Sequence, residues 1–337
     1  MLQDLYEEID PQTLTGYARA ALAADQGTQA LGPWLPDRQV PDITFAVNQV
    51  TAATVSVAEY RAPNSEGSIA DAQYGENVMT GQIPPMTEVG IMKEFDIIRT
   101  RANPGEALIQ QAMSDVGDRV RACSRRINLA RGETLEHGRV VLAEGGLATT
   151  IDWGRNASHS TTAGTLWSDI TADALSDIYD IVDTYNDTNG FMPGYIVVSR
   201  AVLNAFRQTT EVLTATQGTI TYSARASLEA VSTLMENEDL PPFVVNDEVY
   251  NTSSGARRVI SNNIALLLPP ADVLIGNTVH GVSAEAQALG LGVAEQPGIV
   301  ADSWTTRNPV SIATMATSWT VPVLGTPNAT YRFECLA

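Results

Sequence analysis

Five arginines occupy one short stretch of this acidic sequence: Arg119, Arg121, Arg125, Arg126 and Arg131, with no acidic residue between them. Guanidinium groups at this density can hold phosphate, or they can pair with carboxylates of the same chain or of a neighbouring copy. The chain has 39 acidic and 20 basic residues, and its net charge of −19 repels nucleic acid. We therefore favour pairing with acidic groups of an N-terminal arm or a predicted hairpin, and keep phosphate binding as the alternative.

Residues with metal or redox chemistry are few and scattered. His137, His159 and His280 lie far apart in the sequence, and none forms a helical pair with another ligand residue, as in H-E-x-x-H. Cys123 and Cys335 are the only cysteines, too few for a thiolate metal site or a disulfide framework. The sequence predicts no metal and no cofactor, and its cysteine usage is typical of synthesis in a reducing compartment.

Catalytic motifs are absent as well. The sequence contains no G-x-S-x-G elbow, no P-loop and no G-x-G-x-x-G turn, which argues against common hydrolases, nucleotidases and dehydrogenases. Carboxylate pairs such as Asp169 with Asp173, or Glu236 with Glu238, are explained by solvated helix ends. We expect no catalytic residue and no enzymatic activity. The alternative from a different class of function is a hydrolase that uses carboxylates of the middle region.

The chain also lacks signals for export or membrane insertion. Residues 1–10 carry Asp4, Glu7 and Glu8 instead of a basic region followed by an apolar run. No apolar stretch approaches the roughly 18 residues that a membrane-spanning helix needs. We expect neither a signal peptide nor a membrane span.

The arginines lie on the clearest predicted helix of the chain. Asn103 and Pro104 suit its N-terminus, and Gly132 is its predicted end. At about 1.5 Å per residue this helix is roughly 40 Å long. Its buried face follows steps of three or four residues: Leu108, Ala112, Val116, Val120, Cys123, Ile127 and Ala130.

The segments before this helix read as an arm and a hairpin. A helix over about 11–24 is followed by Gly and Pro residues that break regular structure, which indicates an arm over residues 1–51. Val55, Val57 and Tyr60 alternate as in a strand, a polar tip spans 63–67, and 91–98 is the predicted return strand. This hairpin has too few apolar side chains to fold alone, so it must lie on another surface.

The middle and end of the chain predict a mixed α/β region and closing strands. We expect helices over about 171–187, ending at Gly190, over 199–207 and over 227–237. Expected strands are 195–198, 243–245, 259–261, 264–268, 310–315 and 319–324. About 120 residues with this pattern are enough for a core of their own.

Several short motifs resemble one known family when they are taken in order. Ile151-Asp-Trp-Gly-Arg155 precedes Gly164-Thr-Leu-Trp167-Ser-Asp; Val273-Leu-Ile-Gly-Asn-Thr278 follows, and Trp304–Val323 with Asn308-Pro309 closes the series. Together, over about residues 90–325, they resemble the lambda-type coat proteins of tailed bacteriophages, the phage major capsid protein E family. The order of elements is similar to the HK97-type capsid fold.

The resemblance implies an α+β architecture with four parts. These are an N-terminal arm over 1–51, an extended loop over 52–101, a peripheral domain over 102–166 and 293–337 with a long spine helix, and an axial domain over 167–292. It implies a structural protein that self-assembles as hexamers and pentamers of an icosahedral head. In such shells the extended loop lies on an adjacent subunit.

The resemblance also implies partners and a location. The expected partners are further copies of the chain, a separate scaffolding protein, a portal and, as an option, a decoration protein; DNA is enclosed without sequence-specific binding. Assembly in the bacterial cytoplasm and a final place in the virion follow. Candidate contacts between subunits are the five arginines, Lys93, Glu66 and Trp34. Some relatives form covalent cross-links through an extended-loop lysine, but Lys93 lies near the base of the hairpin, which disfavours that chemistry.

Two alternatives remain besides the hydrolase. An encapsulin-like nanocompartment would use the same fold, and a cargo enzyme that co-purifies would favour it. A DNA-binding protein would use the arginine stretch, and salt-sensitive DNA binding would support it.

Overall fold

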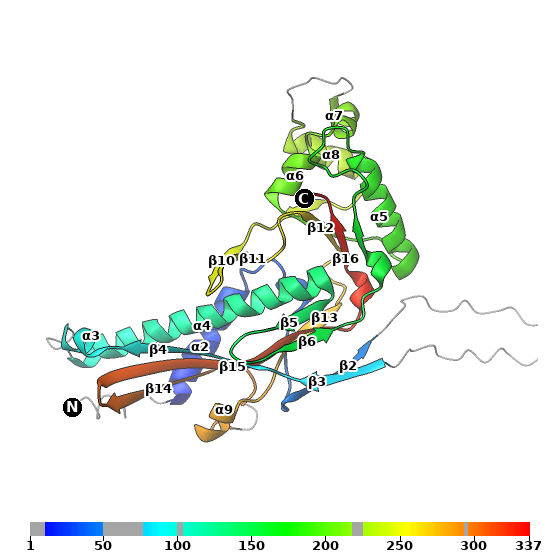
Figure 1. Cartoon of the computed structure of the whole chain (residues 1–337). Coiled ribbons are helices and arrows are strands. Elements are labelled where there is room, and N and C mark those ends of the chain that lie inside the picture. Colours follow the sequence, from blue (N-terminus) through cyan, green and yellow to red (C-terminus); the bar gives the residue numbers. More distant parts are fainter. Residues whose placement is uncertain (1–10, 50–76, 100–103, 218–224, 293–295) are drawn as a thin grey trace, which may run out of the picture. The chain divides into compact units, whose positions relative to one another are not determined.

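The computed structural model describes residues 11–49, 77–99, 104–217, 225–292 and 296–337. Helices and sheets pack as two compact units, each assembled from three separate stretches of sequence (Figure 1). Unit 1 combines Met1–Ala46, Thr80–Arg131 and Gly276–Val323, and unit 2 combines Val47–Met79, Gly132–Ile275 and Leu324–Ala337. The predicted mixture of helices and sheets is confirmed. The predicted boundaries of arm, extended loop, peripheral and axial domains stay a prediction.

Unit 1 is a mostly antiparallel sheet with helices packed on it. Its strands have the order β1-β13-β15-β14, and β4 also pairs with β15. Only β1 runs parallel to its neighbour, β13. The elements are α2 (Pro11–Gln26), η1 (Gly32–Trp34), β1 (Asp37–Gln39), β4 (Pro85–Met92), α3 (Glu94–Arg99), α4 (Pro104–His137), β13 (Gly276–His280), α9 (Ala284–Ala288), β14 (Val300–Arg307) and β15 (Val310–Leu324). The helix predicted over 11–24 is confirmed as α2.

The strand-like runs expected over 310–315 and 319–324 are confirmed, but they form one continuous strand, β15, which pairs with β14 on one side and with β4 on the other. The return strand expected over 91–98 ends at Met92, and α3 follows. In α3, Glu94 and Asp96 lie in the first turn and Arg99 in the last, an arrangement that suits the helix dipole, and Ile97 packs against Met92.

The long helix α4 is confirmed but runs further than predicted. It has 34 residues, about 51 Å at 1.5 Å per residue. Gly132 lies inside the helix instead of ending it. A glycine is required there because the backbone of Val259 crosses the helix: a Cβ at position 132 would lie 2.0 Å from the Val259 carbonyl oxygen. The helix ends at Gly138, which has a φ of 63° and donates its N–H to the Thr134 carbonyl at 2.9 Å.

The predicted buried face of α4 is confirmed where its side chains are described. The side chain of Leu108 lies outside the described residues. From Val116 to Ile127 this face packs against Leu14, Ala18 and Leu22 of α2 and against Ala316 of β15. The apolar core of unit 1 therefore lies between two helices and the sheet.

Unit 2 is a five-stranded sheet covered on one face by helices. The strand order is β7-β16-β12-β8-β9. The elements of the unit are β5 (Arg139–Leu142), β6 (Thr149–Asp152), η2 (Ala157–His159), β7 (Ser160–Thr162), α5 (Ala174–Asn189), β8 (Tyr195–Val198), α6 (Arg200–Phe206), α7 (Thr210–Gln217), α8 (Leu228–Asn237), β9 (Phe243–Val245), β10 (Val249–Thr252), β11 (Gly255–Arg258), β12 (Ile264–Leu268), η4 (Pro327–Ala329) and β16 (Tyr331–Glu334).

Most predicted elements of unit 2 are confirmed by their caps. Gly190 ends α5 in the left-handed conformation at φ 74°, and the hydroxyls of Ser199 and Ser227 accept N–H groups at the starts of α6 and α8. The strand expected over 259–261 is wrong, since the strand is β11, which pairs with β10. Val259 and Ile260 are buried after β11 instead of pairing in a sheet.

The core of unit 2 is apolar and built around one tryptophan of the sequence motifs. Trp167 is buried against Phe206 and Phe333, with ring centroids 5.4 and 5.9 Å away. Its indole N–H donates to the Asp177 carboxylate at 2.8 Å. Because this donor has a partner, a large aromatic ring can fill the centre of the unit.

The predicted hairpin falls largely outside the described residues. Its base is a pair of strands, β2 (Thr44–Gln49) and β3 (Asn77–Gln82). Residues 50–76, which include the predicted tip, lie outside the described part of the chain. Among the helices that are described, none is long and apolar enough to cross a membrane.

Candidate functional site

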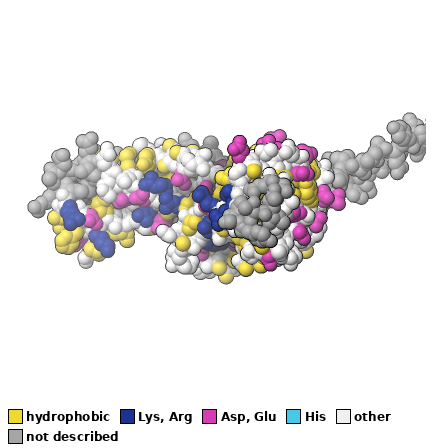
Figure 2. Space-filling model, turned by 90° about the horizontal axis from the view of Figure 1, so that it is seen from above, with side chains coloured by type: hydrophobic (Ala, Val, Ile, Leu, Met, Phe, Trp, Pro, Cys, Tyr) yellow, Lys and Arg dark blue, Asp and Glu magenta, His cyan; other side chains and the backbone are white. Residues whose placement is uncertain are grey.

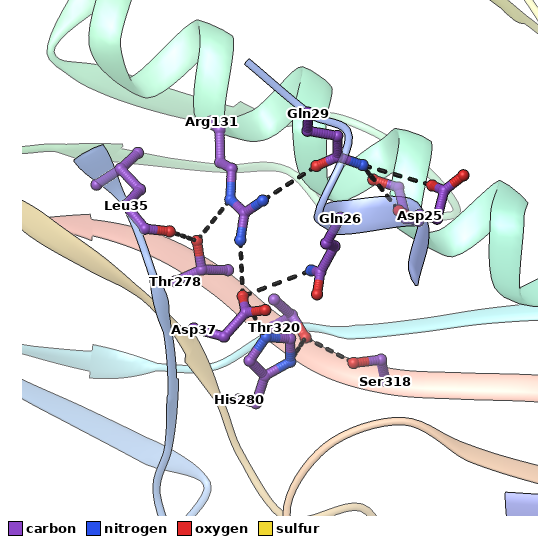
Figure 3. Close-up of polar contacts among 11 residues, drawn as sticks. Asp25, Gln26, Gln29, Leu35, Asp37, Arg131, Thr278, His280, Ser318 and Thr320 are labelled. Carbon is purple, nitrogen blue, oxygen red and sulfur yellow. Dashed lines mark hydrogen bonds and ion pairs between the residues drawn. The ribbon is translucent and has the colours of Figure 1, made fainter. Parts of the chain in front are cut away.

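Arg131 is the centre of a buried polar network in unit 1 (Figure 3). Its side chain is only 2% exposed. The guanidinium donates to Asp37 Oδ1 at 2.6 Å, to Thr278 Oγ1 at 2.8 Å and to Gln29 Oε1 at 3.0 Å. These partners come from β1, β13 and the turn after α2, so one side chain of α4 joins three segments that are distant in the sequence.

The network continues through a histidine. His280 on β13 contacts Asp37 Oδ1 through Nε2 at 2.9 Å, and its Nδ1 lies 3.0 Å from the Thr320 hydroxyl. Burial alone would raise the pKa of Asp37, but the hydrogen bond and charge of His280 and the charge of Arg131 hold it below its usual value. Burial lowers the pKa of Arg131, and Asp37 opposes that shift. The carboxylate of Asp37 is therefore held in its charged form.

A pocket of about 390 Å³ lies beside this network. Asp37 and Arg131 line it together with Gln26, Gln29 and the glycines and prolines of the following turn. A general acid near neutral pH needs a raised pKa, whereas Asp37 has a lowered one. This pocket thus offers an ion pair that supports the fold and gives no support to the hydrolase alternative.

Arg119 pairs with the segment before α4. Its Nη1 donates to Glu88 Oε1 on β4 at 3.3 Å. Its guanidinium lies over Gly90, where a Cβ would be 2.9 Å from Nε. Glycine at position 90 therefore lets this side chain lie flat on the strand.

The other arginines of α4 are more exposed. Arg121 forms an ion pair with Asp118 one turn before it on the same helix, and the Asp118 hydrogen bond raises the pKa of Arg121. Arg125 is exposed and Arg126 half-buried. Figure 2 shows Lys and Arg side chains on the face of unit 1 where α4 lies. Arg121 and Arg125 thus lie at the surface, whereas Arg131 is buried.

The three remaining candidates have different surroundings. Lys93 is exposed directly before α3, and its carbonyl accepts the N–H of Ile97 at 3.2 Å. Trp34 in η1 is buried, with 5% of its surface exposed. Glu66 lies outside the described residues. The structure therefore brings Arg131 and Arg119 together with acidic groups of the chain, and whether any candidate touches another subunit stays a prediction.

A second polar cluster, missed by sequence reasoning, closes the C-terminal end of α4. Arg155 donates to the carbonyls of Leu135 and Glu136 at 3.2 and 2.8 Å. Burial, with the charge of Arg332, lowers the pKa of Arg155 to about 10. The motif 151–155 thus has a structural role, because its arginine binds the last carbonyls of the long helix.

Two buried glutamates of α4 belong to the same cluster. Glu136 Oε2 accepts the N–H of Ser261 at 2.9 Å, and Glu133 accepts the N–H of Val141 at 3.0 Å and pairs with Arg257 at 3.1 Å. These carboxylates fix the hairpin β10–β11 and the strand after the helix. The only sequence signal was an acidic pair on the continuation of the helix beyond Gly132.

The histidines and cysteines of the chain have surroundings that suit a structural role. In the described part of the chain, no group of three His, Cys, Asp or Glu residues is arranged to hold a metal ion. Both cysteines are free and buried; burial raises the pKa of the Cys123 thiol to about 12 and also raises that of Cys335. Burial lowers the pKa values of His137 and His159. Buried thiols with raised pKa values are poor nucleophiles.

Comparison with protein families gives one match. A family model described as phage major capsid protein E matches residues 29–334. A search of the curated proteins gives no match.

Solved structures match over nearly the whole chain. A putative prophage capsid protein from Escherichia coli CFT073 has a TM-score of 0.63 and 14% identity, covering 96% of this chain and 99% of that one. A phage-related protein from Bordetella bronchiseptica has 0.59 and 14%, with 95% of each chain covered. A chain of the satellite phage P4 procapsid has 0.54 and 8%, covering 95% and 90%. These matches confirm the predicted fold of HK97 type.

Proposed function

The chain belongs to the phage major capsid protein E family, and on that premise we propose that it builds the hexamers and pentamers of an icosahedral head enclosing double-stranded DNA. It is a structural protein of the virion. The observation that carries the proposal is the family match over residues 29–334, supported by the fold similarity over 96% of the chain.

The exposed arginines of α4 are the proposed contacts to neighbouring subunits. Arg121 and Arg125 are exposed, and Arg119 keeps 29% of its side-chain surface accessible beside Glu88. Acidic residues of the 52–101 segment of a neighbour, Glu66 among them, are suitable partners because arginine favours interface ion pairs. Arg131 and Trp34 are buried, and a contact through them would require exposure on assembly. Lys93 is proposed as a non-covalent contact.

The charge of the chain suits a container for DNA. With a net charge of −19, the chain as a whole repels phosphates, which suits a shell that DNA must enter and leave. We propose that DNA is enclosed without sequence-specific binding. Salt-sensitive DNA binding through Arg121 and Arg125 would instead support the DNA-binding alternative.

Assembly partners belong to the same proposal. A separate scaffolding protein and a portal are expected from the resemblance, with a decoration protein as an option, and the bacterial cytoplasm as the place of assembly. The encapsulin-like alternative has less support, since the matching family model is that of a phage capsid protein. An enzyme cargo inside purified shells would reverse that preference.

Negative-stain electron microscopy of the recombinant protein, fractionated by size and mixed with its candidate scaffolding protein, tests the proposal. Closed shells or rings of five and six subunits are the expected result. A compact monomer under every assembly condition would overturn it. The variant Arg121→Glu/Arg125→Glu tests the contact surface: it should reduce assembly, and thermal unfolding checks that the variant is folded.

A further inference from the structure

The outer face of α5 in unit 2 carries a row of unpaired carboxylates. Asp180, Asp183 and Asp187 follow each other at steps of three and four residues, are exposed, and so lie on one face of the helix. The 16 residues of α5 include no lysine or arginine. Within the described part of the chain, no ion pair involves these three side chains. We refer to them as the aspartate row.

The aspartate row lowers the stability of the isolated subunit. Like charges at three and four residues repel each other on a helix surface, and no base of the same helix relieves them. A partner that presents positive charge would remove this repulsion. The aspartate row is therefore complementary to a cationic surface.

A cationic surface of the right kind exists in the same unit. Arg200 and Arg258 both bind the single carboxylate of Asp247, at 3.2 Å each. Burial alone would raise the pKa of Asp247, but the backbone N–H of Arg200 and both guanidinium groups lower it, so it remains charged. Two guanidinium groups share one carboxylate, and one positive charge is left over. We refer to Arg200 and Arg258 as the arginine pair.

The arginine pair also has N–H donors that the contacts with Asp247 do not use. The Arg200 side chain is 76% exposed and uses its Nε on Asp247, and Arg258 uses Nη1. A guanidinium has five N–H donors, and each side chain of the pair uses one of them on Asp247. Arg257 next in the chain is different, because it pairs with the buried carboxylate of Glu133.

The two surfaces lie on different sides of unit 2. The helix α5 contacts β16, near one edge of the sheet, whereas α6, which begins at Arg200, contacts β9 at the opposite edge. In Figure 1, α5 forms one side of unit 2, and α6 and the hairpin β10–β11 lie on the other. Two complementary patches on different sides of one subunit suit a head-to-tail contact, which closes into a ring when the rotation fits.

We propose that the aspartate row of one subunit binds the arginine pair of the next subunit around each ring. The partner is thus a second copy of this chain, and the inference rests on the proposed function, which supplies the rings. The contact fixes the direction of the ring, because each subunit offers acid on one side and base on the other. Like charges face each other in any reversed arrangement.

Charge reversal tests the contact. Asp180→Lys/Asp183→Lys and Arg200→Glu/Arg258→Glu should each reduce ring and shell yield about tenfold or more, since like-charge juxtaposition is strongly unfavourable at an interface. The chain with all four changes restores the attraction and the original net charge, and should recover yield to within about twofold. Glu236→Lys/Asp272→Lys changes the net charge by the same amount as Asp180→Lys/Asp183→Lys, outside both surfaces, and should assemble like the wild type.

Mixing the two reversed proteins gives a sharper result. In an equal mixture every favourable contact joins one kind of subunit to the other, so rings must alternate. Six-membered rings can alternate and should form. Five-membered rings cannot, because an odd ring contains at least one like-charge contact, and closed shells should be missing. Electron microscopy counts both ring sizes, and thermal unfolding checks that each variant is folded.

The outcomes separate the inference from the proposed function. Reversed variants that assemble like the wild type, folded four-change chains that do not recover, or five-membered rings in the mixture would each overturn the inference alone, provided that wild type and control assemble. A wild-type protein that forms no rings or shells would overturn the proposed function and the inference with it. Recovery in the four-change chain together with six-membered rings only in the mixture supports both.

Discussion

The two units of the chain place their charges differently. Unit 1 contains 16 acidic and 11 basic residues, and its buried guanidinium, Arg131, meets the partly exposed carboxylate of Asp37, which also contacts the imidazole of His280. Unit 2 contains 23 acidic and 9 basic residues; it has an apolar core, and its buried carboxylates, Glu133 and Glu136, lie at the C-terminal end of α4. The Arg131 network of unit 1 and the packed core of unit 2 should therefore respond to different substitutions.

The largest expected effect is the loss of the buried guanidinium. Arg131→Ala removes a buried guanidinium from its ion pair with Asp37 and takes away the donor that Gln29 Oε1 and Thr278 Oγ1 accept, which should lower the free energy of unfolding by about 3 kcal/mol. Urea unfolding measures the change. Arg121→Ala is the matched control on the same helix, and its ion pair is exposed, so it should change stability by about 0.5 kcal/mol or less. Equal losses in both variants would contradict a special role for the buried guanidinium.

A smaller but sizeable effect is expected where α4 enters unit 2. Gly132→Ala places a Cβ 2.0 Å from the Val259 carbonyl oxygen, so the helix and the segment after β11 must separate. The expected loss is about 1–3 kcal/mol, as for overpacking in a core. Gly16→Ala in α2 is the control, because nothing lies within 4 Å of that Cβ, and it should stabilise by about 0.5–1 kcal/mol. A neutral Gly132→Ala would show that packing in unit 2 is looser than described.

Two carboxyl groups, one in each unit, should give opposite pH dependences of stability. The folded state lowers the pKa of Asp37, so this group contributes stability that is present above its unfolded pKa and is lost as the pH falls through the folded value. In unit 2, burial raises the pKa of Asp177, and its contribution runs the other way, being lost as the pH rises through the folded value. Unfolding temperatures measured from neutral to acidic pH check both signs. Asp37→Asn should flatten the acid loss and Asp177→Asn should not.

The smallest effect concerns the surface of unit 2. Asp183→Asn removes like-charge repulsion with Asp180 and Asp187 on α5 and should stabilise the isolated chain by about 0.2–0.5 kcal/mol at low salt. The gain should shrink as salt screens the charges. Calorimetry at two salt concentrations resolves it. A loss of stability on this substitution would mean that the carboxylate has a partner within the subunit.

Local signals were readable from the sequence. Ser199 and Ser227 at helix starts and Gly190 at a helix end act on their own backbone within four residues, so their chemistry is visible without the fold. Asp37 with Arg131 and Glu88 with Arg119 agree with the expectation that these arginines pair with acidic groups of preceding segments.

Contacts between distant segments were not readable. Glycine at position 132 looked like a helix end because nothing in its neighbours reveals that Val259, more than a hundred residues later, crosses the helix there. Arg155 looked like part of a family motif, and only the folded chain shows that it binds helix carbonyls. For the same reason β15 was read as two strands, since its continuity comes from β4 and β14 on either side.

Neighbouring positions 131 and 132 of α4 restrict where insertions and deletions can be tolerated in this sequence. The side chain at 131 is committed to Asp37 and Thr278, and the missing side chain at 132 is committed to Val259, within a single unbroken helix. Inserting or deleting one residue near these positions would turn one of the two contact positions by about 100° about the helix axis relative to the other, so that the helix could not keep both contacts. Relatives of this chain should therefore differ in length within loops and not at this point of the helix.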